Sequence, residues 1–181
     1  MLTTLDTVLE RISQTLKLIA AVGLILIALL IAADVIGRGA FNYPLIGVAE
    51  LIANFLVIVA FMQLPYTVRI GGMLRSELFD TLAPRVLARA MWVLGYLLGA
   101  LLFALIAHAS WDDMIRAWVT GEFEGHASFR VPTFPVRLAI VVCSILGVIN
   151  YLVLAGRAGI ALMTGNEAPL QAITSGDVRH G

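Results

Sequence analysis

Long apolar runs separated by short polar stretches dominate the chain. An α-helix that crosses the roughly 30 Å hydrocarbon core of a bilayer needs about 20 apolar residues, and four of the runs are long enough. The four predicted spans are residues 16–33, 48–68, 86–109 and 136–163. We therefore predict an all-α membrane protein whose four transmembrane helices form one domain, residues 1–163. The polar tail, residues 164–181, is expected to be disordered.

A fifth apolar pattern, in residues 73–82, is too short and too charged to span a bilayer. Its leucines recur at helical spacing, at Leu74, Leu78 and Leu82, and Arg75 is one of the charged residues between them. This pattern favours a short helix that lies in the membrane interface between the second and third spans.

The third span continues into an amphipathic stretch, residues 110–119. Trp111, Ile115 and Trp118 lie at positions i, i+4 and i+7 and so share one helical face. Tryptophan is enriched at the level of the headgroups, so we expect this stretch to lie at the membrane surface. The Gly- and Pro-containing segment 121–135 is predicted to be a loop.

Composition agrees with a membrane protein, because 60% of the residues are hydrophobic and only 13% are charged. The net charge is zero and there is no basic block, which argues against a nucleic-acid partner. The single cysteine, Cys143, lies in an apolar run and fits a packing role. Asp6 and Glu10 before the first run do not fit a cleavable signal peptide, so that run is predicted to be a retained anchor.

Basic residues are distributed unequally between the two sides of the predicted bundle. The first side carries Arg11, Lys17, Arg69, Arg75, Arg85, Arg89, Arg157 and Arg179, and the second carries Arg38, Arg116, Arg130 and Arg137. Cytoplasmic segments of membrane proteins carry the excess of Lys and Arg. Both termini, and with them the polar tail, are therefore predicted to be cytoplasmic.

Ionisable residues near the spans are few, and each one needs a partner. Asp34 and Arg38 are four residues apart, acid first, which favours a helical ion pair. That pair could close the first helix at the interface or contact a partner subunit. Glu50 begins the second helix, where the helix dipole favours a negative charge, and Asn54 lies one turn deeper. These two could form a polar patch against another helix, or Glu50 could pair with Arg38; no polar ladder crosses the bilayer to favour ion conduction.

Small residues at four-residue spacing indicate two candidate packing faces. Gly95 and Gly99 form a GxxxG pair in the third span, and Ala139, Cys143 and Gly147 follow one another in the fourth. Helices in lipid associate where small residues let their backbones approach. Each face could meet another helix of this chain or a partner subunit.

We predict no catalytic, cofactor or metal site. His108 is the only histidine within a predicted span, whereas a membrane b-type haem needs two axial ligands. Asp112 and Asp113 have no His or Glu at ligand spacing beside them. Hydrolase, zincin and P-loop motifs are missing, and four helices without a visible repeat are few for a transporter acting alone. The residues therefore indicate a non-enzymatic subunit of a larger complex.

Several short motifs resemble the small membrane subunit of tripartite ATP-independent periplasmic (TRAP) transporters. They are A-D-V-I-G-R at 33–38, F-N-Y-P at 41–44, G-V-A-E-L at 47–51, R-I-G-G at 69–72 and V-P at 131–132. The resemblance covers residues 16–163. The chain departs from the family at Met73, where a histidine often follows the Gly-Gly turn.

The resemblance implies a multi-pass subunit of a bacterial inner membrane, beside a large multi-span subunit that carries the sodium and substrate sites. A periplasmic binding protein would deliver the solute, often an organic acid. The small subunit would scaffold the static part of an elevator-type transporter and help to dock the binding protein. The alternative is a stand-alone four-helix membrane protein, either a small channel or a membrane-embedded enzyme.

The same resemblance implies roles for individual residues. The candidates for ordering the periplasmic end of the first two helices, against each other or the large subunit, are Asp34, Arg38, Glu50 and Asn54. Gly95 and Gly99 are further candidates for a partner interface. The candidate anchors are Arg69 and Arg75 at the cytoplasmic headgroups, and Trp111 and Trp118 at the outer interface.

Overall fold

The computed structural model describes residues 2–41, 47–70, 85–124 and 131–164 of the chain. Its helices are α1 (Leu2–Phe41), α2 (Val48–Arg69), α4 (Arg85–Thr120) and α5 (Phe134–Thr164), and its strands are β1 (Phe123–Glu124) and β2 (Val131–Pro132). Each of the four helices contains an apolar stretch long enough to cross a bilayer, which confirms the predicted all-helical class. The predicted interfacial helix, with Arg75, lies outside the described residues, as do residues 165–181 of the tail.

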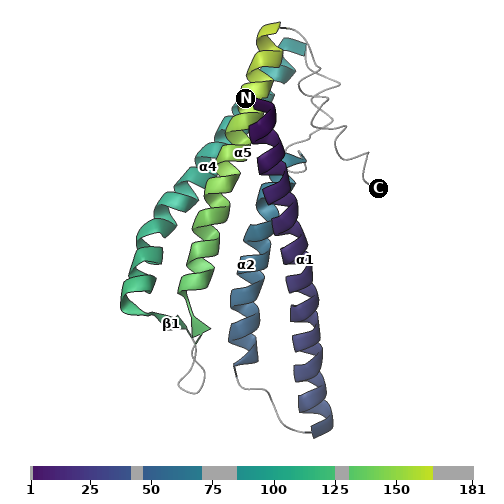
Figure 1. Cartoon of the computed structure of the whole chain (residues 1–181), viewed down its shortest axis with the longest axis vertical. Coiled ribbons are helices and arrows are strands. Elements are labelled where there is room, and N and C mark those ends of the chain that lie inside the picture. Colours follow the sequence, from purple (N-terminus) through teal and green to yellow (C-terminus); the bar gives the residue numbers. More distant parts are fainter. Residues whose placement is uncertain (1, 42–46, 71–84, 125–130, 165–181) are drawn as a thin grey trace.

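The helices form two antiparallel hairpins, α1–α2 and α4–α5 (Figure 1). The hairpins meet where α2 packs against α5. They converge at the end that holds the start of α1 and the end of α5, and they splay apart toward the strand pair. Because the chain crosses four times, the first and last helices place their outer ends on the same side of the bundle.

α1 and α4 are much longer than the spans predicted for them. They contain 40 and 36 residues, which is about 60 and 54 Å of helix, against roughly 30 Å of hydrocarbon. We expected the first helix to leave the lipid at Asp34, yet the helix itself continues to Phe41. Arg38 lies one turn after Asp34 and pairs with it, which stabilises the added turns. The amphipathic stretch 110–119 is likewise part of α4.

The segment that was predicted to be a loop, 121–135, contains the short strand pair and the start of α5. Phe123 lies opposite Pro132 in the antiparallel pair. The chain turns after α4 at Gly121, whose φ of 61° suits glycine. Thr133 then donates two hydrogen bonds of 3.1 Å to the Glu122 carbonyl, one from its backbone N–H and one from its hydroxyl. Sequence periodicity could not reveal strands of only two residues, because alternation needs a longer run to be visible.

α5 is the central helix of the bundle. In its most apolar stretch 44% of the residues are buried, against 22% or less in the other three helices. α4 and α5 approach closely because glycines on each helix lie under aromatic rings of the other. A Cβ at Gly99 would lie 2.6 Å from the Tyr151 ring, and one at Gly147 would lie 2.8 Å from the Phe103 ring. The small-residue faces that the sequence indicated therefore meet within this chain at these two positions.

A separate cluster joins α1 to α2. Ala20 and Ile27 of α1 are buried against Val59 of α2, and a Cβ at Gly23 would lie 2.9 Å from a Val59 methyl carbon. The buried positions in the described part of α1 are Leu9, Ser13, Ala20, Ile27 and Asp34, and the last four recur every seven residues. A seven-residue repeat is the signature of two helices that pack along a continuous seam.

Replacing Gly99 with alanine should destabilise the α4–α5 hairpin, because the added methyl group has no room beside the Tyr151 ring. We expect a loss of about 1–3 kcal/mol, as is typical of overpacked cores, measured by thermal unfolding in mild detergent. Gly159→Ala on α5 is the matched control, since a Cβ there meets nothing within 4 Å. Equal unfolding temperatures for the two variants would contradict the assigned contact.

Candidate functional site

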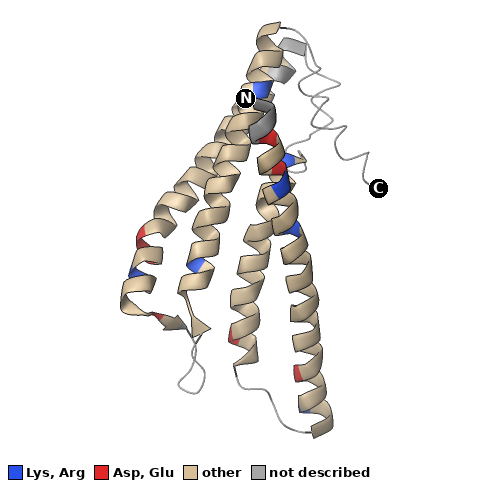
Figure 2. Ribbon diagram, viewed as in Figure 1, with Lys and Arg blue, Asp and Glu red and all other residues tan. Residues whose placement is uncertain are grey.

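Charged residues lie toward the two ends of each hairpin and leave the middle of the helices uncharged (Figure 2). The uncharged stretches run between Lys17 and Asp34 on α1, Glu50 and Arg69 on α2, and Arg137 and Arg157 on α5. At 1.5 Å per residue each stretch is about 26–30 Å long, which matches the hydrocarbon core of a bilayer. Both groups of charges therefore lie where headgroups would meet the protein.

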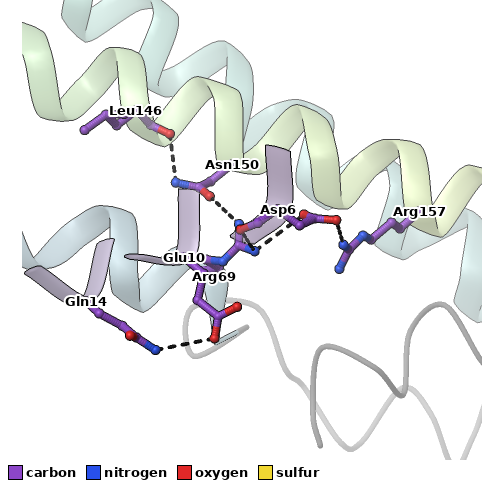
Figure 3. Close-up of polar contacts among 7 residues, drawn as sticks. All are labelled: Asp6, Glu10, Gln14, Arg69, Leu146, Asn150 and Arg157. Carbon is purple, nitrogen blue, oxygen red and sulfur yellow. Dashed lines mark hydrogen bonds and ion pairs between the residues drawn. The ribbon is translucent and has the colours of Figure 1, made fainter. Parts of the chain in front are cut away.

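Four polar residues meet at the end where the hairpins converge, and we call them the Asp6 cluster: Asp6, Arg69, Asn150 and Arg157 (Figure 3). The Asp6 carboxylate lies between two guanidinium groups. One of its oxygens pairs with Nη2 of Arg157, and the other lies 3.4 Å from Nη2 of Arg69. Arg69 also donates to the Asp6 carbonyl at 2.8 Å and, through Nη1, to Oδ1 of Asn150 at 3.1 Å.

The Asp6 cluster joins three helices from both hairpins, because Asp6 belongs to α1, Arg69 to α2, and the other two residues to α5. The side chains of Asp6 and Arg69 are each only 16% exposed. Asn150 is fully buried, and its amide nitrogen donates to the Leu146 carbonyl at 3.0 Å. Charge pairs that are partly removed from water and also hydrogen-bonded are stronger than exposed ones. The cluster therefore holds α1 and α2 to α5.

A second group lies at the opposite end, where α4 leads into α5, and we call it the Asp113 cluster: Asp113, Arg116, Glu122 and Arg137. Arg137 lies 3.1 Å from Glu122 and donates to the Asp113 carbonyl at 2.7 Å. Arg116 pairs with Asp113. These side chains are more exposed than those of the Asp6 cluster, so each pair contributes less.

An open apolar cavity of about 280 Å³ lies on α4 and the start of α5, lined by Met114, Ile115, Trp118 and Phe134. The Trp118 and Phe134 rings are stacked at a tilt, with their centroids 4.7 Å apart. Trp111 and Trp118 are both exposed. Their role as anchors at the outer interface stays a prediction.

Of the polar residues predicted from sequence, Asp34 and Arg38 form the expected ion pair, with a carboxylate oxygen 2.5 Å from Nη2. Asp34 is buried, whereas the Arg38 side chain is 58% exposed. Asn54 is also buried, and its amide donates to the Glu50 carbonyl one turn earlier on the same helix, at 3.0 Å. Asn54 thus satisfies its polar group locally, and the exposed guanidinium of Arg38 stays available for a further contact.

Two other candidates have neighbours that the sequence did not indicate. Arg69 points into the Asp6 cluster, and its role as an anchor at the cytoplasmic headgroups stays a prediction. Gly99, a candidate for a partner interface, lies against Tyr151 of the same chain. Gly95, one turn earlier on α4, is half-buried.

Sequence reasoning missed the Asp6 cluster. It used Asp6 only as evidence against a signal peptide and Arg157 only in the count of basic residues, and it gave Asn150 no role. Two signals were present: Asn150 interrupts an apolar run, and four crossings bring residues near 6, 69 and 157 to one side. What the sequence did not contain was the rotation of each helix about its own axis.

The described residues hold no group of three His, Cys, Asp or Glu that could bind a metal ion. Within that same part of the chain, the hydroxyl of Ser144 is the one buried side-chain polar atom without a hydrogen-bond partner. The buried amides of Asn54 and Asn150 are bonded to carbonyls of their own helices.

Replacing Asp6 with asparagine should loosen the junction, because two partly buried guanidinium groups lose their shared carboxylate. Breaking a fully buried pair costs about 3–5 kcal/mol, and partial exposure reduces our expectation to about 1–3 kcal/mol. Thermal unfolding in mild detergent measures this loss. Glu10→Gln is the control, since Glu10 is exposed and its described hydrogen bond is with Gln14 of its own helix. If both variants unfold at the wild-type temperature, the junction does not depend on Asp6.

Comparison with known proteins identifies the family of this chain. The family model described as tripartite ATP-independent periplasmic transporters, DctQ component, matches residues 27–158, which is more than half of the chain. The match begins within α1 and ends within α5, so it includes part or all of every described helix. No curated protein and no solved structure matches the chain. The chain therefore belongs to the DctQ family, the small membrane subunit of tripartite ATP-independent periplasmic transporters, and is a transport component rather than an enzyme.

Proposed function

We propose that this chain is the static scaffold of a sodium-coupled TRAP transporter that takes up an organic-acid-type solute. The observation that carries the proposal is the distribution of polar groups in the bundle. Charges lie at the two ends, and the buried amide nitrogens of Asn54 and Asn150 donate to carbonyls of their own helices. A subunit of this kind supports a transport path on another chain and has none of its own.

The outer surfaces of the spans support the same proposal. In the most apolar stretches of α1, α2 and α4 no more than 22% of the residues are buried inside the bundle, against 44% in α5. Examples of exposed residues are Leu18 and Leu29 on α1, Leu56 on α2, and Leu98 and Leu105 on α4. A four-helix bundle with so little interior has ample surface for both lipid and a large membrane subunit.

The sodium and solute sites are proposed to belong to the large subunit. Sodium and carboxylate solutes are bound in transporters by broken helices and convergent polar groups near the midplane. α1, α2, α4 and α5 are continuous there and carry no charge between the two end groups. The periplasmic binding protein would approach the splayed end, where α1 presents Arg38 and α4 presents Arg116.

The convergent end of the bundle is proposed to face the cytoplasm. The charged residues of the described helices at this end are Arg11, Lys17, Arg69, Arg85, Arg89 and Arg157 against Asp6 and Glu10. The splayed end instead has an excess of carboxylates, since Asp34, Glu50, Asp112, Asp113 and Glu122 outnumber Arg38, Arg116 and Arg137. The positive-inside rule therefore favours cytoplasmic termini.

We expect affinity-tagged wild-type chain, extracted in mild detergent, to co-purify with one large multi-span subunit. The purified pair should take up solute in proteoliposomes only when the binding protein and an inward sodium gradient are present. Uptake or catalysis by the chain alone would contradict the proposal and favour a stand-alone membrane protein.

Replacing Arg38 with alanine should reduce recovery of the large subunit by about tenfold or more, since truncating one member of an interfacial charge contact costs about 2–5 kcal/mol. The solute affinity of the binding protein should not change. Arg116→Ala is the matched control, because Arg116 is 59% exposed, is also paired within its helix and lies at the same end. Wild-type assembly by the Arg38 variant would remove that residue from the interface.

The orientation can be tested with single engineered cysteines and a membrane-impermeant thiol reagent. Thr120→Cys at the end of α4 should be labelled in cells with a permeabilised outer membrane. Thr164→Cys at the end of α5 should be labelled only after the inner membrane is broken. Both positions are exposed, whereas the native Cys143 is buried. The reverse labelling pattern would overturn the proposed orientation.

A further inference from the structure

The Asp6 cluster lies at the depth of lipid phosphates. Arg69 and Arg157 each end an uncharged stretch of about 30 Å on their helices, so their guanidinium groups lie at one boundary of the hydrocarbon core. The cluster is also the place where α1, α2 and α5 come together (Figure 3). Basic pockets between transmembrane helices at this level bind anionic headgroups.

The cluster has more positive than negative charge. A single carboxylate, from Asp6, serves the guanidinium groups of both Arg69 and Arg157. Lys17 of α1 is a further cation, and its ammonium group lies over the Tyr66 ring of α2, 3.9 Å from the centroid. Figure 3 also draws the Glu10 carboxylate, whose described hydrogen bond is with Gln14 of its own helix. An unbalanced cation at the edge of a low-dielectric region attracts an anion.

Of the two arginines, Arg157 is the one placed to meet that anion. Arg69 uses both of its terminal nitrogens on Asp6 and Asn150, and its side chain is 16% exposed. Arg157 uses only Nη2 on Asp6, and its side chain is 28% exposed. A guanidinium group has five N–H donors in a planar fork that suits a phosphate. The described contacts of Arg157 therefore do not use all of its N–H donors.

We propose that the Asp6 cluster binds the phosphate of an anionic phospholipid, with Arg157 as the residue that contacts it and Asp6 as the residue that orients Arg157. The bound headgroup supplies the negative charge that the cluster lacks. It also rests against the junction of the two hairpins, so the lipid strengthens the contact between α1 and α5. This site is separate from the scaffold role and needs no partner chain.

The test uses the full chain in nanodiscs that contain either phosphatidylcholine alone or a mixture of phosphatidylcholine and phosphatidylglycerol. Native mass spectrometry after gentle release counts the lipids retained by each chain. Wild-type chain should retain phosphatidylglycerol over phosphatidylcholine by about fivefold, the effect expected of one cation near the surface. Arg157→Gln should lose this preference, and Arg157→Lys should keep part of it. Arg116→Gln, a paired arginine at the opposite end, should match the wild type.

Three outcomes would overturn the proposal. The first is wild-type chain that retains both lipids equally, which decides the question even if Arg157→Gln fails to fold. The second is Arg157→Gln chain that folds in phosphatidylcholine and still prefers phosphatidylglycerol. The third is displacement of the retained lipid by soluble glycerol phosphate, which would assign the site to free phosphate esters. Failure of the large subunit to co-purify affects none of these results, so the two proposals fail independently.

Discussion

The absence of water over about 30 Å is the constraint on which this structure depends. Within that thickness a polar group must find its partner inside the protein. Asn54 and Asn150 do so through carbonyl groups one turn earlier on their own helices. Charged groups lie at the boundaries, where pairs such as Asp34 with Arg38 can still reach water. The bundle is thus an apolar slab with a polar cluster at either end.

Within the slab, an apolar helix face is covered as well by lipid as by another helix. Helices therefore associate where their surfaces fit closely together. α4 and α5 fit together in this way at two places, because the Tyr151 ring packs on Gly99 and the Phe103 ring packs on Gly147. The α1–α2 hairpin has its own buried cluster around Ala20. Each hairpin is therefore packed along its own seam, and the contact between hairpins is left to α2 and α5.

The inter-hairpin contact combines an apolar and an ionic part. Val68 of α2 belongs to the same buried cluster as Leu154 of α5, and the next residue, Arg69, enters the Asp6 cluster. Contact at one end and separation at the other give a wedge whose spans are mostly not buried inside the bundle. Such a wedge is compatible with the proposed scaffold role. A lipid phosphate bound at Arg157 would neutralise the excess positive charge of the Asp6 cluster.

The sequence by itself determined the features that depend only on residues close together in the chain. Apolar run length fixed the four spans, and four-residue spacing fixed the Asp34–Arg38 pair, since both are properties of one helix. The short motifs identified the family. Tertiary structure alone decided which faces meet: Arg69 lies 63 residues from Asp6 in sequence, and Arg157 lies 151 residues from it. When a helix is apolar on every side, its sequence pattern does not show which face packs against a neighbour. The rotation of such a helix about its axis is set only by the fit of side chains, such as Tyr151 over Gly99.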